Sequence, residues 1–274
     1  IPGEGVGINA NTQEICISDF AKLILRENLL NLIPSGYKLN LKIIFPKGKF
    51  LSKRTSNNAF GIVEGLSIIG TTADTYASAS QEQLENAKKE LDLSISDKSN
   101  EKITFVIGEN GLDIAKRESI STPIIKIGNW IGPLLVYAAA KNIKEVLIVG
   151  YHGKLIKLAG GIFHTHNHLA DGRIEILCYL AFQSKIPLPL INNMSKADTI
   201  EEALIIVEGF NQEMANLLWN KIANTVEERS KKYINKYTDS QLLIGAVLFD
   251  RKRRIRWKGN NGLSMFTKLR TFKE

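Results

Sequence analysis

Several features are scarce in this chain of 274 residues, and each scarcity excludes a class of protein. The two cysteines, Cys16 and Cys178, lie far apart and in no metal-binding or redox spacing, so we expect no disulfide framework. No run of about 18 apolar residues is present, which argues against a membrane-spanning helix. Residues 1–7 lack the charged and apolar regions of a secretion signal. We therefore expect a cytoplasmic protein with no membrane partner.

Common nucleotide-binding motifs are also missing. The sequence contains neither G-x-G-x-x-G nor a Walker lysine motif, so a standard dinucleotide or nucleoside-triphosphate site is not indicated. Internal repeats and low-complexity tracts are absent too. The chain begins with Ile1 inside a glycine-rich segment rather than with Met, and we expect that a segment precedes it.

The chain is basic, with 36 Lys and Arg residues against 28 Asp and Glu residues. Much of the excess lies in residues 229–232 and 251–256. Such a charge favours an anionic partner. We interpret residues 251–256 as a basic strand edge, because charged residues commonly protect exposed edges. A polycarboxylate ligand is the second interpretation, and a nucleic-acid-binding module is a third.

Residues 1–58 are predicted to form a small α+β piece. Residues 20–32 have the pattern of a short helix, and residues 38–45 alternate polar and apolar as a half-buried strand does. After the polar, basic segment 53–58 the pattern changes. We therefore place a domain boundary there and assign residues 59–274 to a second domain.

The second domain is predicted to be a Rossmann-like α/β domain, with a mostly parallel sheet and flanking helices. Short apolar runs end in glycine and are followed by helix-like sequence, which is typical of parallel strands with crossover helices. The predicted strands are residues 66–69, 103–107, 124–127 and 146–149. Helices are predicted from about residue 81, at 134–141 and at 211–233. Residues 241–274 are interpreted as a strand pair and basic tail whose placement is left open.

Glycine-bearing loops follow each of the four predicted strands. Ligands of open α/β sheets collect outside the carboxyl ends of the strands, so we expect these loops to converge on one crevice. The Glu109 carboxylate could hold the ribose hydroxyls of a nucleoside cofactor. Each loop alone is better explained as a plain turn, whereas four in succession fit a ligand site equally well. The candidate cofactor-binding residues are Gly70, Thr71, Thr72, Gly108, Glu109, Asn110, Gly111, Gly128, Asn129 and Gly150.

All four histidines, His152, His164, His166 and His168, lie in one segment, residues 150–173. The last three would share one side of an extended segment, whereas a helix would align only His164 with His168. A zinc-dependent hydrolase is one alternative. Because no cysteine lies nearby and a ligand from another element is missing, we favour polar contacts or acid/base chemistry and expect no metal.

Charged residues accompany the histidines. Lys154 and Lys157 would share a helix face that meets either anions or solvent. Asp171 and Arg173 either orient the histidines or form a loop cap and a surface ion pair. The candidate catalytic residues are His152, His164, His168 and Asp171, and the candidate substrate-binding residues are Lys154, Lys157, His166 and Arg173.

Four stretches, residues 53–72, 107–111, 128–133 and above all 150–173, resemble the cobalt-precorrin-5B (C1)-methyltransferases, the CbiD family of anaerobic cobalamin biosynthesis. The resemblance covers residues 1 to about 210. It implies transfer of a methyl group from the cofactor S-adenosyl-L-methionine to C1 of a cobalt tetrapyrrole, with the cobalt carried by the substrate. It also implies two domains, of which this chain holds only a remnant of the first.

The family's substrate would account for the basic charge. A tetrapyrrole of this pathway carries acetate and propionate groups, which lysine, arginine and histidine side chains complement. Methyl transfer from a sulfonium is an in-line displacement, so the protein must chiefly align the two reactants. The resemblance thus implies that the partner is an anionic cobalt tetrapyrrole and that no nucleic acid is bound. Whether the chain forms a homo-oligomer is left open.

Overall fold

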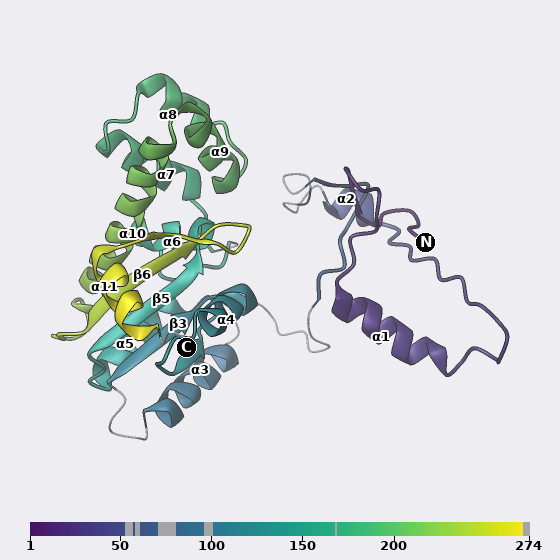
Figure 1. The fold of residues 1–274 in the computed structure, drawn as a ribbon, viewed down its shortest axis with the longest axis horizontal. Helices are drawn as coiled ribbons and strands as arrows, with labels where there is room; N and C mark the ends of the chain where they lie inside the picture. The colour runs from purple at the N-terminus through teal and green to yellow at the C-terminus, as the bar shows by residue number, and fades with distance from the viewer. Residues whose placement is uncertain (53–56, 58–60, 71–80, 96–100, 168, 271–274) are drawn as a thin grey trace. The chain divides into compact units, whose positions relative to one another are not determined.

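The computed structural model describes residues 1–52, 57, 61–70, 81–95, 101–167 and 169–270, which form two compact units, Ile1–Tyr76 and Ala77–Glu274 (Figure 1). The sequence placed the boundary after residue 58. The difference arises because β1 (Ile8–Asn9) pairs antiparallel with β2 (Ile62–Val63). Residues 66–69, predicted as the first strand of the parallel sheet, make bridges to Val6 and Ile17 instead and belong to the first unit.

The first unit contains two helices, α1 (Asp19–Leu30) and α2 (Gly48–Ser52). The predicted helix at residues 20–32 is confirmed by α1, which Ser18 caps by accepting a hydrogen bond from the Ala21 N–H. The predicted strand at residues 38–45 is wrong: only Ile43 forms a bridge, and most of the segment is exposed. Alternation alone does not make a strand where no full-length neighbour pairs with it.

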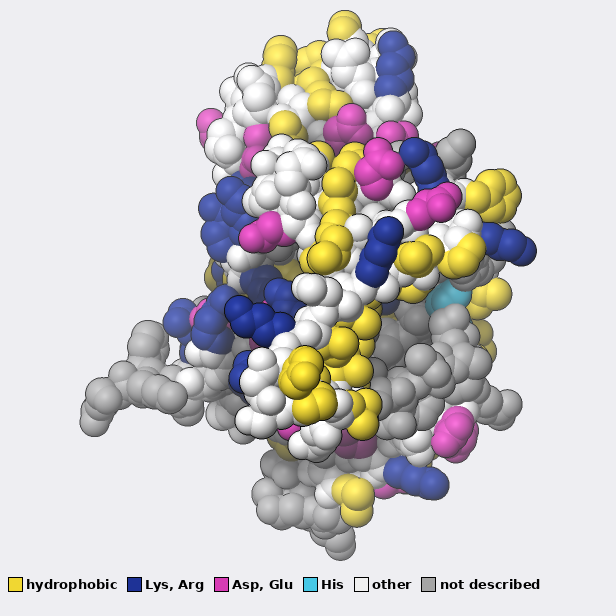
Figure 2. Space-filling model, turned by 90° about the vertical axis from the view of Figure 1, so that its right-hand side faces the viewer, with side chains coloured by type: hydrophobic (Ala, Val, Ile, Leu, Met, Phe, Trp, Pro, Cys, Tyr) yellow, Lys and Arg dark blue, Asp and Glu magenta, His cyan; other side chains and the backbone are white. Residues whose placement is uncertain are grey.

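Apolar side chains reach the surface of the protein. Helix α1 buries none of its residues, and its Leu23 and Leu30 are about half exposed. In the space-filling view, hydrophobic side chains form a band beside groups of Lys and Arg (Figure 2).

Among the described residues, no helix has both the length and the apolar character that crossing a bilayer requires.

The second unit is built on a five-stranded sheet in the order β4-β3-β5-β6-β7. Strands β3, β4, β5 and β6 are parallel, and β7 runs antiparallel to β6. Their bounds are β3 (Lys102–Val106), β4 (Ile124–Lys126), β5 (Glu145–Tyr151), β6 (Leu243–Phe249) and β7 (Ile255–Lys258). The predicted, mostly parallel sheet is therefore confirmed. The prediction succeeds because short apolar runs are typical of parallel strands whose two faces are covered by helices.

Helices cover both faces of this sheet (Figure 1). The larger core lies against α3 (Gln81–Ser94), α5 (Ile131–Ala140), α6 (His152–Ala159) and α10 (Gln212–Ile234). The smaller core lies against α4 (Gly108–Arg117) and α11 (Asn260–Leu269). The predicted helices at 81, 134–141 and 211–233 are confirmed by α3, α5 and α10. Three helices that were not predicted stand at one end of the unit: α7 (Arg173–Gln183), α8 (Leu188–Met194) and α9 (Ile200–Phe210).

The carboxyl ends of the four parallel strands meet at one edge of the sheet. The chain leaves β3 to form β4 on one side and then returns to form β5 on the other side. Ligands of open α/β sheets bind at such a switch point. Helices α4, α5 and α6 all begin at this edge, and the residues predicted to bind ligands in the second unit gather there.

Candidate functional site

Gly108 and Gly128 adopt backbone conformations that favour glycine. Their φ angles are +70° and +55°, and no atom lies within 4 Å of where a Cβ on Gly108 would stand. Residues 108–111, predicted as a loop, form the first turn of α4 instead. Within that turn Gly111 is buried, and a Cβ there would lie 3.2 Å from the Val149 carbonyl oxygen. Gly108 therefore leaves open space for a ligand, whereas Gly111 allows α4 to pack against β5.

The remaining predicted cofactor residues have varied surroundings. A Cβ on Gly150, inside β5, would lie 2.9 Å from Cγ of Leu155. Glu109 Oε1 pairs with Lys126 Nζ at 2.5 Å, and both side chains are about half exposed. Asn110 is exposed. Gly70 belongs to the first unit, where its carbonyl accepts a hydrogen bond from the Ser18 hydroxyl at 2.6 Å, and Thr71 and Thr72 lie outside the described residues.

The amino ends of α4, α5 and α6 lack side-chain caps. Their N-cap residues, Ile107, Trp130 and Tyr151, make no capping hydrogen bond with a side chain. Backbone N–H groups in a first helical turn have no partner within the helix, and the helix dipole is positive at that end. In α5 the Gly132 N–H is bonded to the Phe163 carbonyl and Pro133 has no N–H, so the amino ends of α4 and α6 are the ones that make this edge suited to an anionic group.

The histidine-rich segment is joined to the loop between β4 and α5. The Thr165 hydroxyl donates to Asn129 Oδ1, and the Thr165 N–H donates to the Asn129 carbonyl, both at 3.1 Å. The Gly132 N–H donates to the Phe163 carbonyl at 3.0 Å. Asn129, predicted as a cofactor ligand, therefore holds the histidine-rich segment at the carboxyl edge.

Lys157 holds the same segment in place through three hydrogen bonds. Its side chain is fully buried, and Nζ donates to the Thr165 carbonyl at 3.1 Å, to Asn167 Oδ1 at 2.7 Å and to the Ala170 carbonyl at 2.8 Å. Burial lowers the pKa of this ammonium group. All three of its protons are used inside the protein, so the geometry gives Lys157 an anchoring part.

Lys154 lies one helical turn before Lys157 and differs from it. Its side chain is partly buried, and burial together with the charge of Lys157 lowers its pKa. Among the described residues no carboxylate pairs with it. Lys154 is thus a positive charge that the described part of the chain leaves uncompensated.

His152 is fully buried and uses both ring nitrogens. Its Nδ1 accepts a hydrogen bond from the Trp219 indole at 2.7 Å, and its Nε2 lies 2.8 Å from Glu201 Oε2. An indole N–H can only donate, so Nδ1 carries no proton and Nε2–H donates to the carboxylate. The Tyr151 hydroxyl donates to the same oxygen at 3.2 Å. Burial would raise the pKa of Glu201, but the hydrogen bonds from His152 and Tyr151 bring it below its usual value.

His164 has the opposite environment. Both of its ring nitrogens are buried, and neither has a hydrogen-bond partner within the described residues. Its ring meets Trp130 edge to face, at a centroid distance of 4.5 Å and an angle of 84°, and burial is the main cause that lowers its pKa. The His166 ring lies 6.4 Å away, and His168 lies outside the described residues. The described residues contain no group of three His, Cys, Asp or Glu side chains suited to a metal ion.

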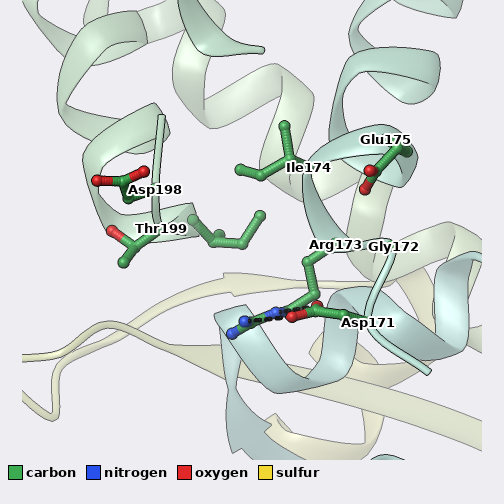
Figure 3. A pocket seen from close by; sticks show the side chains of 8 residues that line it. Asp171, Gly172, Arg173, Ile174, Glu175, Asp198 and Thr199 are labelled. Atoms are coloured by element: carbon green, nitrogen blue, oxygen red, sulfur yellow. Dashed lines mark hydrogen bonds and ion pairs between the residues drawn. The ribbon is translucent and has the colours of Figure 1, made fainter. Parts of the chain in front are cut away.

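Asp171 and Arg173 form a two-point ion pair beside a cavity. Arg173 donates from Nε to Asp171 Oδ1 at 2.5 Å and from a terminal nitrogen to Oδ2 at 2.8 Å, which lowers the pKa of Asp171. The cavity, of about 230 Å³, has this pair on one side and Asp198 and Thr199 on another (Figure 3). The predicted ion pair is thus present at the amino end of α7, next to the amino end of α9.

The structure brings together most of the predicted residues of the second unit, and it adds residues that the sequence did not indicate. Glu201, Trp219 and Trp130 contact the predicted histidines. Glu201 and Trp219 are 49 and 67 residues away from His152 along the chain. No local pattern marks such partners. Trp130 alone lies in one of the stretches that resemble the CbiD family, residues 128–133.

Comparisons with known proteins identify the family of this chain. Residues 2–77 match the family model CbiD, and residues 164–260 match the model of the CbiD C-terminal domain. The chain is 60% identical over 272 residues to a cobalt-precorrin-5B C(1)-methyltransferase of Prochlorococcus marinus subsp. pastoris, covering 99% of this chain and 73% of the relative. The protein of the same name from Prochlorococcus marinus strain MIT 9515 is 58% identical, with the same coverage.

A solved structure, the crystal structure of the cobalamin biosynthesis protein cbiD from Archaeoglobus fulgidus, is similar at 24% identity with a TM-score of 0.41, covering 62% of this chain and 55% of that one. The family follows from the two family models and from the 60% and 58% identity to the Prochlorococcus proteins over 99% of this chain. The chain belongs to the CbiD family of cobalt-precorrin-5B C(1)-methyltransferases, and it is a methyltransferase of cobalamin biosynthesis.

Proposed function

We propose that this chain transfers the methyl group of S-adenosyl-L-methionine to C1 of cobalt-precorrin-5B. The names of the relatives above give the methylated compound and the C1 position. The observation that supports it most strongly is the carboxyl edge of the sheet. Three uncapped helix ends and an open glycine turn meet there with a segment rich in histidine and lysine. The hydrolase alternative has no support in these names.

The residues at this edge fit a cofactor with a carboxylate and a ribose. The space beside Gly108 lets a ligand approach the backbone, and the amino end of α4 offers N–H donors to a carboxylate. Glu109 is exposed enough to meet ribose hydroxyls, although it also pairs with Lys126. Gly128 contributes the second turn with positive φ. When bound, S-adenosyl-L-methionine supplies the electrophilic methyl group.

The histidine-rich segment is proposed to hold the tetrapyrrole. Lys154 supplies positive charge to its carboxylates, and His166 and the remaining N–H groups of Arg173 supply donors, while Lys157 keeps the segment folded. His152 and Asp171 are committed to hydrogen bonds within the protein, so they position neighbouring groups. His164, whose nitrogens have no described partner, is the residue best placed to exchange a proton with the substrate.

Calorimetric titration with S-adenosylhomocysteine, the product of the donor, tests the cofactor half of this proposal. We expect saturable binding at one site per chain. A Gly108→Ala variant should lose at least about tenfold in affinity, because a methyl group would enter the open space beside the helix end. The matched control is Gly161→Ala, since Gly161 has φ +84° and also no atom within 4 Å of a Cβ position.

Both substitutions carry the same backbone strain, roughly 1 kcal/mol for alanine at positive φ. A general effect of strain would therefore weaken both variants equally. If Gly108→Ala binds S-adenosylhomocysteine as tightly as the unchanged chain does, the cofactor does not lie beside Gly108. Loss of binding in Gly108→Ala alone supports the placement.

A further inference from the structure

Three buried nitrogen atoms at the carboxyl edge lack a hydrogen-bond partner within the described part of the chain. They are Nε1 of Trp130 and the two ring nitrogens, Nδ1 and Nε2, of His164. The two rings touch edge to face, with centroids 4.5 Å apart. Buried polar atoms in folded proteins are nearly always hydrogen-bonded, because an unpaired one is unfavourable. Three such atoms on two touching side chains mark a place where a polar partner is expected.

The chemistry of these atoms favours an acceptor with more than one oxygen. An indole nitrogen can only donate, and a histidine ring offers one donor when neutral and two when protonated. The charge of Lys157 acts on both His164 and Lys154, and Lys154 has no carboxylate partner among the described residues. Donors therefore outnumber acceptors in this cluster. A carboxylate, planar and with two acceptor oxygens, is the complementary group.

The other tryptophans of the chain show that this situation is particular to Trp130. The Trp219 indole donates to His152 Nδ1 at 2.7 Å, and the Trp257 indole donates to Asn216 Oδ1 at 3.1 Å. Both of those residues are almost fully buried in the core. Trp130 is partly exposed and lies at the amino end of α5, at the carboxyl edge of the sheet.

The geometry points to a carboxylate-binding subsite formed by Trp130 and His164, with Lys154 supplying charge, that receives one of the two reactants of the methyl transfer proposed above. The inference thus rests on the proposed function and adds Trp130 to it. Both reactants carry carboxylates, on the methionine part of the donor and on the acetate and propionate groups of the tetrapyrrole. The nitrogens are buried but both residues are partly exposed, so the two side chains must turn to meet the group.

Nuclear magnetic resonance of the indole N–H groups of the whole chain tests the subsite directly. The chain has three tryptophans, so three indole signals are expected, and a Trp130→Phe variant identifies that of Trp130. S-adenosylhomocysteine is added first and cobalt-precorrin-5B second. We expect the Trp130 signal to move with one of them, which names the source of the carboxylate. The signals of Trp219 and Trp257 should stay, because their N–H groups are already bonded.

Kinetics of Trp130→Phe and His164→Phe separate binding from folding. Both variants keep an aromatic ring and lose the unpaired nitrogens. We expect KM for the bound reactant to rise about tenfold or more, as for loss of a hydrogen bond to a charged group. Tm should stay unchanged or rise, because the folded protein loses an unpaired group. The matched control, Trp257→Phe, breaks the bond to Asn216, so its Tm should fall while KM is unchanged.

Two results would overturn the subsite. One is a Trp130 signal that stays fixed with both reactants while the unchanged chain methylates its substrate. The other is a Trp130→Phe variant with a lower Tm and an unchanged KM, which is the behaviour of a structural residue. Failure of the unchanged chain to methylate counts against the proposed function alone, and the Trp130 signal with each reactant then still decides the subsite.

Discussion

At the scale of single residues, Lys154 and Lys157 show how the surroundings of a side chain decide its part. Replacing Lys157 with Met removes the donor that three acceptors share, one of them buried and two partly buried. We expect the free energy of unfolding to fall by about 2–3 kcal/mol, because the acceptors of the histidine-rich segment lose their partner. Urea denaturation followed by tryptophan fluorescence measures this, since all three tryptophans lie in the second unit.

Lys154→Met is the matched control for that experiment. Lys154 stands on the same helix, and the described residues provide it with no carboxylate partner, so the same substitution should change stability by about 0.5 kcal/mol or less. Its effect should appear in substrate affinity instead. Equal destabilisation by the two substitutions would contradict the different parts assigned to these lysines.

The sequence identified chemically active residues more reliably than it identified their partners. Residue type alone marked His152 and Lys157, and the pairing of Asp171 with Arg173 was among the expected arrangements. The partners of His152 come from α9 and α10, and the acceptors of Lys157 include two backbone carbonyls. Such contacts depend on tertiary packing, which residue spacing does not encode. His164 and His152 consequently looked alike in sequence and have opposite environments.

At the scale of elements, a buried carboxylate from α10 caps the amino end of α11. Glu227 accepts hydrogen bonds from the N–H groups of Ala246 at 3.0 Å, Asn261 at 3.1 Å and Gly262 at 2.7 Å. Gly259 makes room, since a Cβ there would overlap the carboxylate. We expect Glu227→Ala to reduce the free energy of unfolding by about 2–3 kcal/mol, because three backbone donors lose their acceptor.

The neighbouring residue of the same helix gives a control for Glu227→Ala. Glu228 is exposed, and Glu228→Ala changes helix propensity by the same amount without touching α11. Its effect on urea denaturation should stay within about 0.5 kcal/mol. A comparable loss in both variants would mean that helix propensity or charge, rather than the cap, accounts for the effect.

Elements defined by long apolar runs were predictable, and elements defined by packing were not. Strands β3 and β5 consist of runs that are buried on both faces, so the sequence fits no other environment as well, whereas the edge strand β4 buries only Ile125 fully. Residues 38–45 alternate in the same regular way but lie largely exposed without a full-length partner. Residues 66–69 end in glycine like the true strands, yet they bridge to Val6 and Ile17 in the first unit. A local sequence pattern therefore does not specify which strand or segment will pair with it.

At the scale of the whole molecule, His164, whose ring nitrogens are buried, should make the stability of the fold depend on pH. In the unfolded chain His164 takes up a proton near its ordinary pKa of 6.5, and in the folded chain its pKa is lower, mainly because burial disfavours the charged ring. Between these two values the unfolded state binds more protons than the folded state. The free energy of unfolding should therefore decrease as pH falls from 6.5 toward the folded pKa.

Carboxylates extend the same trend to lower pH. The pKa values of Asp92, Asp171, Glu201 and Asp250 lie below their usual values. Their stabilisation is present above the unfolded pKa and is lost as pH falls through the folded pKa. Protonation of His164 thus accounts for the loss of stability near pH 6, and protonation of the four carboxylates accounts for the loss near pH 4 and below.

His164→Phe separates the histidine part from the rest. Urea denaturation of the unchanged chain and of the variant, at a series of pH values from about 8 to about 4, measures the difference directly. We expect the variant to lose less stability between about pH 6.5 and 5 and to follow the unchanged chain below that range, because the carboxylates are common to both. Parallel curves through the whole range would show that His164 is not held neutral by the fold, and would also weaken the case for its unpaired nitrogens as part of a carboxylate subsite.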